Sequence, residues 1–210
     1  MLQLLSFTTI SKQGDLFISQ FQLRQREFIE RQNYDVHSVD GMEFDKYDTL
    51  ASKYLVYTLD GKTVLGASRL TPIGFGCMLQ DHFDEFVDDK TVFSTPDVWE
   101  GTRFCIDSRL PPEQRRLICQ TLVCGYLEFG IQRGVDRIIG LMPTMILRTV
   151  FERNGIALER LGAARSFGDS VKLQAASIAV SQMQLDRTRL RTGLEAVLFD
   201  DRPIRQEHAA

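Results

Sequence analysis

The chain has 210 residues, of which 43% are hydrophobic and 25% are charged, the composition of an ordinary globular protein. A chain of this length buries a full core without disulfide or metal staples, so we expect a single domain over residues 1–210, with a disordered tail after about residue 200. The formal net charge of −3 argues against broad binding to nucleic acid or to an anionic membrane surface.

The first predicted element is a helix over residues 14–31, in which an apolar stripe alternates with charged residues. Arg24, Phe28 and Arg31 are spaced four and three apart, so they share one face of this helix. Residues 32–49 lack a clear period and are rich in Asp, which predicts a long loop. A loop of this length inside a compact domain is usually functional or mobile.

The rest of the chain predicts strands that alternate with helices. Residues 53–58 and 63–70 are strand-like, and Asp60-Gly61 between them signals a two-residue hairpin turn. The later elements are a strand over 98–106, a helix over 113–133, a strand over 135–141, a helix over 144–153, strands over 156–160 and 170–180, and a helix over 183–194. This order predicts an α/β fold with a mixed, largely antiparallel sheet and helices on both faces.

The cysteines and the start of the chain predict a cytoplasmic protein. None of the four cysteines has CxxC spacing and no histidine clusters with one, which predicts reduced thiols and no metal site. The first seven residues have no basic leader and too short an apolar run for a signal peptide. No stretch of the sequence approaches the length of a membrane span.

The sharpest candidates for chemistry are Glu100 and Arg103 in the predicted strand 98–106. A Glu is rare in a buried strand unless it is paired or used, and desolvation raises a carboxyl pKa toward that of a general base. Positions three apart face opposite sides of a regular strand. Both side chains therefore reach one cleft only if a bulge lies between them, which Gly101 permits. A purely structural ion pair is the alternative.

The acidic pair Asp45 and Asp48 has three possible roles. The two carboxylates are solvated loop groups, contacts for a sulfonium or ammonium cation, or partners that hold Arg69 and Arg103 in place. Arg69 itself, at the end of the second hairpin strand, is also suited to a salt bridge with Glu100. Several charged groups within apolar runs indicate a polar cleft, because such groups are costly to bury unless they are paired or used.

Two further sets of residues, each with arginines, allow either a structural or a functional interpretation. Arg24 and Phe28 either snorkel and pack, or offer a guanidinium and an aromatic face to a ligand with a carboxylate and an adenine. A second set forms either a solvated basic face or a landing surface for an acidic carrier protein, and it comprises Arg148, Arg153, Arg160 and Arg165.

These motifs together resemble those of the acyl-homoserine lactone synthases, the LuxI-type autoinducer synthases. The family pattern has an early Arg, a Phe four residues on, an aromatic residue six beyond that, an Asp-x-x-Asp pair, a Gly-x-x-Arg-Leu-x-Pro segment and a Glu-x-x-Arg-Phe strand. The matching residues here are Arg24, Phe28, Tyr34, Asp45, Asp48, Gly66, Arg69, Leu70, Pro72, Glu100, Arg103 and Phe104. Arg-Asn-Gly at 153–155 and Glu-Arg-Leu-Gly at 159–162 also resemble the family.

The resemblance implies a three-layer α/β/α sandwich akin to the GNAT acyltransferases. It implies transfer of a fatty acyl group from acyl carrier protein or acyl-CoA to the amine of S-adenosylmethionine (SAM). Lactonisation then releases methylthioadenosine and gives a quorum-sensing signal, and no cofactor takes part. By the family pattern, the SAM site comprises Arg24, Phe28, Tyr34 and Arg103. The catalytic set, in which Glu100 assists deprotonation of the amine, comprises Glu100, Asp45, Asp48, Arg69 and Arg103.

An acyl chain also needs a dry tunnel. The candidates to line it, each of which also suits an ordinary core, are Met78, Leu79, Phe104, Leu122, Met142, Thr144, Met145, Leu147 and Val150. Two positions depart from the family or are ambiguous. Tyr34 replaces the usual Trp and offers a smaller stacking area. A family Thr linked to 3-oxo-acyl preference lies near Thr144, or Pro143 takes its place.

Two alternatives stay open at this point. A general GNAT acyltransferase usually cradles the pyrophosphate of CoA on a glycine-rich loop, but residues 109–114 before the long helix contain prolines and no glycine. A non-catalytic ligand sensor on the same scaffold would tolerate loss of Glu100 or of the aspartates. Formation of methylthioadenosine from SAM and an acyl donor separates an enzyme from a sensor.

Overall fold

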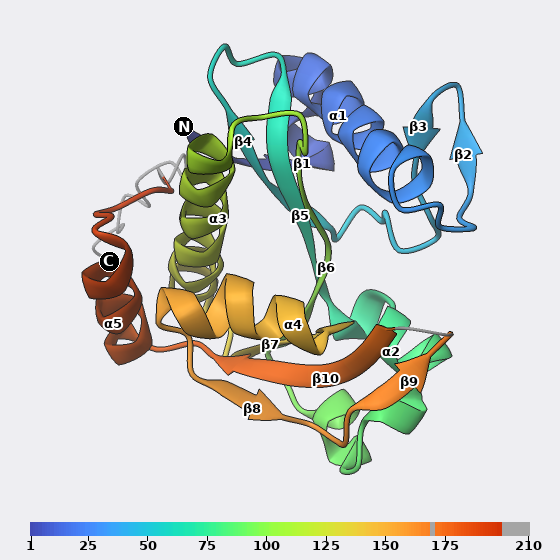
Figure 1. Ribbon diagram of the computed structural model, residues 1–210, viewed down its shortest axis with the longest axis vertical. Helices are drawn as coiled ribbons and strands as arrows, with labels where there is room; N and C mark the ends of the chain where they lie inside the picture. The colour runs from blue at the N-terminus through green and yellow to red at the C-terminus, as the bar shows by residue number, and fades with distance from the viewer. Residues whose placement is uncertain (169–170, 199–210) are drawn as a thin grey trace, which may run out of the picture.

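The computed structural model describes residues 1–168 and 171–198, and eight of the strands in these residues form one mixed sheet (Figure 1). The order across it is β1 (Leu2–Ser6), β4 (Lys53–Thr58), β5 (Val64–Pro72), β6 (Val98–Ile106), β7 (Arg137–Pro143), β10 (Val171–Ala179) and β8 (Leu158–Arg160); β9 (Arg165–Phe167) also pairs with β10. Neighbouring strands are antiparallel except β6 and β7, which are parallel.

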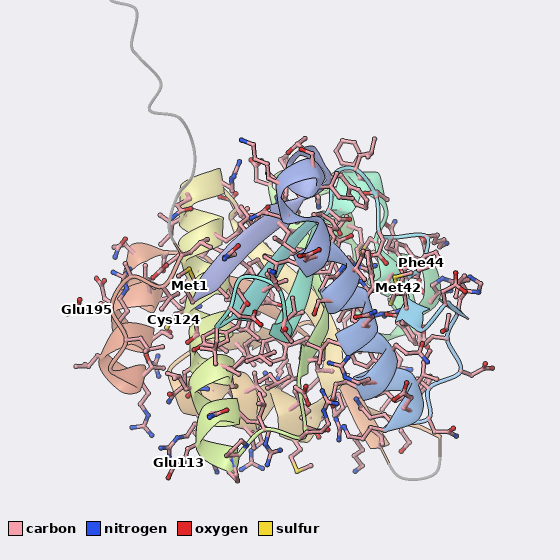
Figure 2. All side chains as sticks on the ribbon, turned by 90° about the horizontal axis from the view of Figure 1, so that it is seen from above. Met1, Met42, Phe44, Glu113, Cys124 and Glu195 are labelled. Atoms are coloured by element: carbon pink, nitrogen blue, oxygen red, sulfur yellow. The ribbon has the colours of Figure 1, made fainter. Side chains whose placement is uncertain are left out.

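Helices cover both faces of this sheet, which confirms the expected three-layer α/β/α arrangement. One face carries α1 (Ile10–Arg24), its π-helical continuation (Gln25–Glu30) and α2 (Met78–His82). The small hairpin of β2 (Ser38–Val39) and β3 (Met42–Glu43) lies beside α1. The other face carries α3 (Pro112–Arg133), α4 (Thr144–Ile146) with its π-helical continuation (Leu147–Phe151), and α5 (Gln182–Thr192). Figure 2 shows Met42 and Phe44 beside α1 and Cys124 on α3, on opposite sides of the strands.

The alternation of side chains along β4 explains why the sheet has a core on each face. Tyr54 and Val56 point to one face and pack in a cluster with Leu16 of α1. Leu55, between them in sequence, points to the other face and packs in a cluster with Leu122 of α3. A strand with apolar residues at every position is typical of a sheet that is covered on both faces.

The sheet opens between its two central strands. β6 and β7 pair only where Val98–Glu100 meets Arg137–Ile139, near the start of each strand. Beyond this point β6 continues along β5 while β7 continues along β10, and the two halves of the sheet separate in Figure 1. The end of pairing puts Glu100 and Gly101 at the apex of the opening, so a site built there has access to both halves.

Most predicted elements are present, and the differences are local. The first helix begins at Ile10, and residues 25–30 are π-helical. The predicted loop 32–49 contains the β2–β3 hairpin. The turn predicted at Asp60-Gly61 spans residues 59–63 instead, because the Asp60 carboxylate accepts the backbone N–H groups of Lys62 and Thr63 and enlarges it. The short strands β1 and β9 are absent from the sequence prediction, and the predicted tail lies outside the described residues.

Two general expectations concern the cysteines and the membrane. All four cysteines are free, as their spacing predicted. In the part of the chain that the structure describes, every helix is too short or too polar to cross a bilayer.

Candidate active site

Six charged side chains form a closed circle of ion pairs between α1, β3, the turn after β3, β5 and β6. Arg24 contacts Glu43 at 2.6 Å, and Glu43 contacts Arg103 at 2.9 Å. Arg103 contacts Asp45 at 2.6 Å, and Asp45 contacts Arg69 at 2.5 Å. The circle closes through Asp48, which lies 3.0 Å from Arg69 and 2.9 Å from Arg24. We call these six residues the ion-pair ring; its three positive and three negative charges sum to zero.

Local structure explains how the Asp-x-x-Asp spacing serves the ion-pair ring. Residues 45–48 form a tight turn, in which the Asp48 N–H donates to the Asp45 carbonyl at 3.0 Å. The Asp48 carboxylate in return accepts the Asp45 N–H at 2.9 Å, and the Asp45 carboxylate accepts the Tyr47 N–H at 2.8 Å. The turn holds both carboxylates toward the arginines. Of the alternatives for this pair, the geometry is that of partners that hold arginines in place.

The side chains of Arg24 and Arg69 are deeply buried in the ion-pair ring, each about 1% exposed. Arg24 forms two parallel hydrogen bonds to Asp48 at 2.9 Å and a third to Glu43. Although burial opposes ionisation of Asp48, these arginines hold the pKa of its carboxyl well below the ordinary range. Burial likewise opposes ionisation of Asp45, and Arg69 lowers its pKa. Asp45 and Asp48 therefore stay charged at neutral pH.

Glu100 lies next to the ion-pair ring but is not a member of it. Its carboxylate is about 3% exposed and accepts the backbone N–H groups of Met78 at 2.8 Å and Leu79 at 2.7 Å, where α2 begins. Burial raises the pKa of Glu100, and the two backbone donors oppose this effect. A carboxyl group whose pKa is raised in a cleft is a candidate general base.

A β-bulge allows Arg103 to reach the same region as Glu100. In the β5–β6 ladder, Ala67 pairs with Cys105 and Arg69 pairs with Thr102, so two β6 residues face one on β5. Arg103 takes φ of +54°, in the left-handed region. The predicted bulge is thus present, but its expected place at Gly101 is wrong. Gly101 stays in register with its partner on β5. A larger residue does not fit there, because a Cβ atom would lie 2.9 Å from Tyr126.

Aromatic residues cover one side of the ion-pair ring. The Arg103 guanidinium lies over the Phe28 ring, 5.7 Å from its centroid, and Phe28 stacks on Tyr34 at 5.8 Å and 18°. Tyr34 is 49% exposed and therefore accessible to a ligand. Arg31, which shares the predicted helix face, instead pairs with Glu27 and does not join the ion-pair ring.

A small apolar cavity of about 20 Å³, partly open to solvent, occupies the opening of the sheet beyond Glu100. Gly101 and Gly140 both line it and lie close together, since a Cβ atom on Gly140 would lie 2.8 Å from the Gly101 carbonyl oxygen. The full lining is Gly101, Tyr126, Ile138, Ile139, Gly140, Met142, Leu147, Phe151, Leu158, Ala176 and Ile178. The polar ion-pair ring and this apolar cavity thus both include a residue of β6, Arg103 in the ring and Gly101 in the cavity.

Some of the residues proposed for the acyl tunnel line this cavity and others do not. Met142 and Leu147 line the cavity, and Phe104 packs at 5.8 Å on its lining residue Phe151. The second group, Met78, Leu79, Leu122 and Val150, does not line it. Leu79 and Leu122 are core residues, Val150 packs against the α3-side core, and the Met78 sulfur lies 3.7 Å from the Arg103 guanidinium.

The structure does not place Thr144 and Met145 in the lining of this cavity. Both line a shallow hollow on the outer face of the α4 region, and Met145 is 68% exposed. Helical periodicity explains the direction of Met145, because Leu147 and Phe151, four apart, turn inward and leave Met145 on the other side.

A scan against protein-family models decides the class of this site. Residues 9–188 match the model described as autoinducer synthase. The chain belongs to the autoinducer synthase family. An acyl-homoserine-lactone synthase of Rhizobium radiobacter is 29% identical to it over 189 residues, which cover 87% of this chain and 88% of that relative.

Solved structures agree with this assignment to the autoinducer synthases. The CoA-dependent acyl-homoserine lactone synthase BjaI, solved with SAM and isopentyl-CoA, matches with a TM-score of 0.85 and 26% identity, covering 97% of this chain and 94% of that one. A putative N-acetyltransferase from Lactobacillus plantarum shares the fold alone, with a TM-score of 0.55, 15% identity, and coverage of 86% of this chain and 99% of that one. The chain is thus an acyltransferase of the acyl-homoserine-lactone synthase type, with a GNAT-like fold.

The sequence interpretation of this autoinducer synthase missed one member of the ion-pair ring. Glu43 is fully buried and joins Arg24 to Arg103, yet it was not among the predicted site residues. The sequence did indicate it, because Glu43 lies between the apolar residues Met42 and Phe44, as Glu100 lies in an apolar strand after Trp99. A lone Glu between apolar residues predicts a paired or functional carboxylate in both places.

Proposed function

We propose that the ion-pair ring, Glu100 and the apolar cavity form one active site, in which SAM is acylated and then lactonised. The observation that carries the proposal is the position of Glu100, between a self-neutralised polar cluster and an apolar opening in the sheet. A zwitterionic sulfonium substrate needs the polar side, and a fatty acyl chain needs the dry side. The product is an N-acyl-homoserine lactone, a signal for quorum sensing.

The aromatic side of the cluster suits the nucleoside of SAM. Phe28 and the exposed ring of Tyr34 offer stacking faces for adenine, and Arg103 is placed over Phe28. Because the ion-pair ring is neutral, we assign Arg24, Asp45, Asp48 and Arg69 to positioning. Asp45 and Asp48 then act by holding Arg69 and Arg103 rather than by meeting the sulfonium directly.

Glu100 supplies the proton acceptor for the first step. The α-ammonium of SAM gives a proton to the Glu100 carboxylate, directly or through one water. The neutral amine attacks the thioester carbonyl carbon, a C–N bond forms and the C–S bond breaks. A second proton from the nitrogen leaves with the thiolate, which departs as a thiol. In the second step the SAM carboxylate attacks the methylene carbon bonded to sulfur. The lactone closes as the C–S bond breaks toward the sulfonium, and methylthioadenosine leaves with the electron pair.

The cavity holds the acyl chain in this proposal. Its volume of about 20 Å³ is far below that of ordinary ligand pockets, so the lining side chains must move apart to admit an acyl group. Met142 and Leu147 contribute its wall on the side of the α4 region. The reacting end of the chain then lies at Gly101, the residue after Glu100.

The donor is an acyl thioester on carrier protein or on CoA. Two of the predicted basic residues, Arg148 and Arg153, line the hollow on the outer face of the α4 region. Arg160 pairs with Glu152 at 2.6 Å, and Arg165 is exposed on β9. This basic face suits an acidic carrier protein or the phosphates of CoA. Both substrates and the four free cysteines fit a reaction in the cytoplasm.

Product analysis tests the proposal. Purified protein is mixed with SAM and an acyl donor, offered once on carrier protein and once on CoA, and products are measured by mass spectrometry. We expect methylthioadenosine and an N-acyl-homoserine lactone in equal amounts with at least one donor. Failure to form methylthioadenosine with every donor would contradict the proposal, and so would its release without a lactone.

A further inference from the structure

A relay of hydrogen bonds borders the apolar cavity and has no part in the proposed reaction. The hydroxyl oxygens of Tyr126 and Ser68 lie 2.5 Å apart. The Ser68 hydroxyl donates to the backbone carbonyl of Thr102 at 3.0 Å. Tyr126 lines the cavity, and its phenol oxygen lies 2.9 Å from the position of a Cβ atom on Gly101. The phenol oxygen therefore lies at the cavity wall that Gly101 forms.

The direction of this relay follows from its last member. A backbone carbonyl has no proton, so the single proton of Ser68 is committed to Thr102. Tyr126 must then donate its own proton to the Ser68 oxygen. Burial raises the pKa of Tyr126, so the side chain is a neutral phenol at physiological pH. The phenol oxygen has only lone pairs left, and it presents an acceptor to the cavity rather than a donor.

We propose that Tyr126 is a specificity-determining residue, which selects the acyl group by the substituent that the chain carries near its thioester. A hydroxyl on the chain donates to the phenol oxygen, and an unsubstituted chain passes it in van der Waals contact. An oxo group on the chain places its own oxygen, an acceptor, against the phenol oxygen of Tyr126, which is also an acceptor. To bind an oxo group, Tyr126 must reverse the relay, which leaves the Thr102 carbonyl without its Ser68 donor.

The position of Tyr126 beside Gly101 of β6 indicates which carbon of the acyl chain it contacts. Gly101 follows Glu100 directly on β6, so the phenol oxygen lies one strand residue along from the proposed base and on the opposite, α3-covered face of the sheet. The carbons nearest the thioester are those that pass this point, and the third carbon is the one that carries hydroxyl or oxo groups in fatty acyl chains. This inference rests on the proposed acyl transfer, because it needs the chain in the cavity.

The test uses three six-carbon donors that differ only at the third carbon: hexanoyl, 3-hydroxyhexanoyl and 3-oxohexanoyl thioesters. Each is offered on CoA and on carrier protein, and kcat/KM is measured from methylthioadenosine release. We expect the wild type to favour the hydroxy over the oxo donor by about tenfold. Tyr126→Phe removes the acceptor and brings the two values to within about threefold. Ser68→Ala frees the phenol proton and raises kcat/KM for the oxo donor.

The control is Tyr57→Phe, which removes a phenol hydroxyl outside the cavity lining and leaves the hydroxy-to-oxo ratio unchanged. A wild-type preference for the oxo donor overturns the inference, and so does a ratio that persists in a Tyr126→Phe protein with a normal melting temperature. If Tyr126→Phe melts early, the Ser68→Ala result decides. These outcomes leave the proposed acyl transfer intact, whereas absence of methylthioadenosine with all six donors overturns both.

Discussion

Glu100 and Arg103 lie three residues apart on β6, yet both contact Met78. The Glu100 carboxylate accepts the Met78 N–H at 2.8 Å, and an Arg103 nitrogen lies 3.7 Å from the Met78 sulfur. On a regular strand these side chains would face opposite sides of the sheet. The bulge at Arg103 brings them together, so the start of α2, the base and the ion-pair ring form one unit.

Replacement of the base gives the first prediction. Glu100→Gln keeps an oxygen for one of the two backbone donors at α2 but removes the carboxylate. We expect turnover to fall by roughly 100-fold or more, the usual contribution of a general base, with a modest loss in melting temperature. Steady-state release of methylthioadenosine beside a melting curve measures both. The matched control is Glu159→Gln, at an exposed site on β8. Unchanged turnover in Glu100→Gln would remove this residue from the mechanism.

The pH dependence of turnover follows from the same group. Burial raises the pKa of Glu100 above its ordinary value of 4.5, and a base acts only when deprotonated. The rate therefore rises with pH through a limb that lies above pH 4.5. A kcat profile measures this limb in the wild type and in Glu100→Gln, where it should be absent. A limb of the same position in both proteins would assign it to another group.

Acid sensitivity of the fold tests the ion-pair ring. Arginine contacts hold the pKa of Asp48 below 3.8, so its stabilisation is present above that pH and is lost as pH falls. Asp48→Asn leaves Arg24 and Arg69 short of a buried partner, and we expect a loss of about 3 kcal/mol at pH 7. The loss should shrink on acidification. Urea unfolding at pH 7 and at pH 2, below the ordinary pKa of 3.8, gives the comparison. Asp186→Asn, on the surface of α5, is the control.

A stability loss in Asp48→Asn that stays the same at both pH values would contradict this account, because the difference would then come from packing rather than from charge.

The geometry of Arg24 predicts that lysine cannot replace it. Arg24 makes three hydrogen bonds to two carboxylates, and an ammonium group cannot reproduce the two parallel bonds to Asp48. We expect Arg24→Lys to weaken SAM binding by about tenfold, because the ion-pair ring no longer holds Arg103 against Phe28. Isothermal titration calorimetry measures the affinity. Arg31→Lys, at a half-exposed site outside the ion-pair ring, should bind as the wild type. Equal affinity in both variants would show that the ion-pair ring does not contribute to SAM binding.

The wall of the cavity predicts chain-length selection. Met142 lines the cavity, so Met142→Ala lengthens the space available to an acyl chain. We expect kcat/KM to shift by about tenfold toward donors that are two carbons longer. The matched control is Met183→Ala, at a site 80% exposed on α5. A series of saturated donors from four to twelve carbons reads out the shift, and an identical profile in both variants would place the acyl chain elsewhere.

Local sequence signals were sufficient for much of the fold. A short run of consecutive apolar residues identified β4, and the Pro-Pro-Glu start with helical spacing identified α3. The Asp-x-x-Asp and Glu-x-x-Arg motifs also identified most of the charged site, because buried charges need partners. The family pattern then grouped residues that only the tertiary structure brings into contact.

Other features depended on long-range contacts that no local pattern encodes. The closed ion-pair ring needs Glu43, whose partners come from α1 and from β6. The bulge forms at Arg103 rather than at Gly101, because Tyr126 of α3 already fills the space beside the glycine. Met145 is exposed although a methionine suits a core, because it lies on the side of the α4 region away from Leu147 and Phe151.

A crystal structure of the protein with SAM and a stable analogue of an acyl thioester tests the central claim most directly. We predict the α-nitrogen of SAM within about 3 Å of the Glu100 carboxylate, or one water away, with the adenine on the Phe28 and Tyr34 side. The acyl chain should run past Gly101 into the cavity. SAM bound away from the ion-pair ring, or an acyl chain lying on the outer face of the α4 region, would contradict the account.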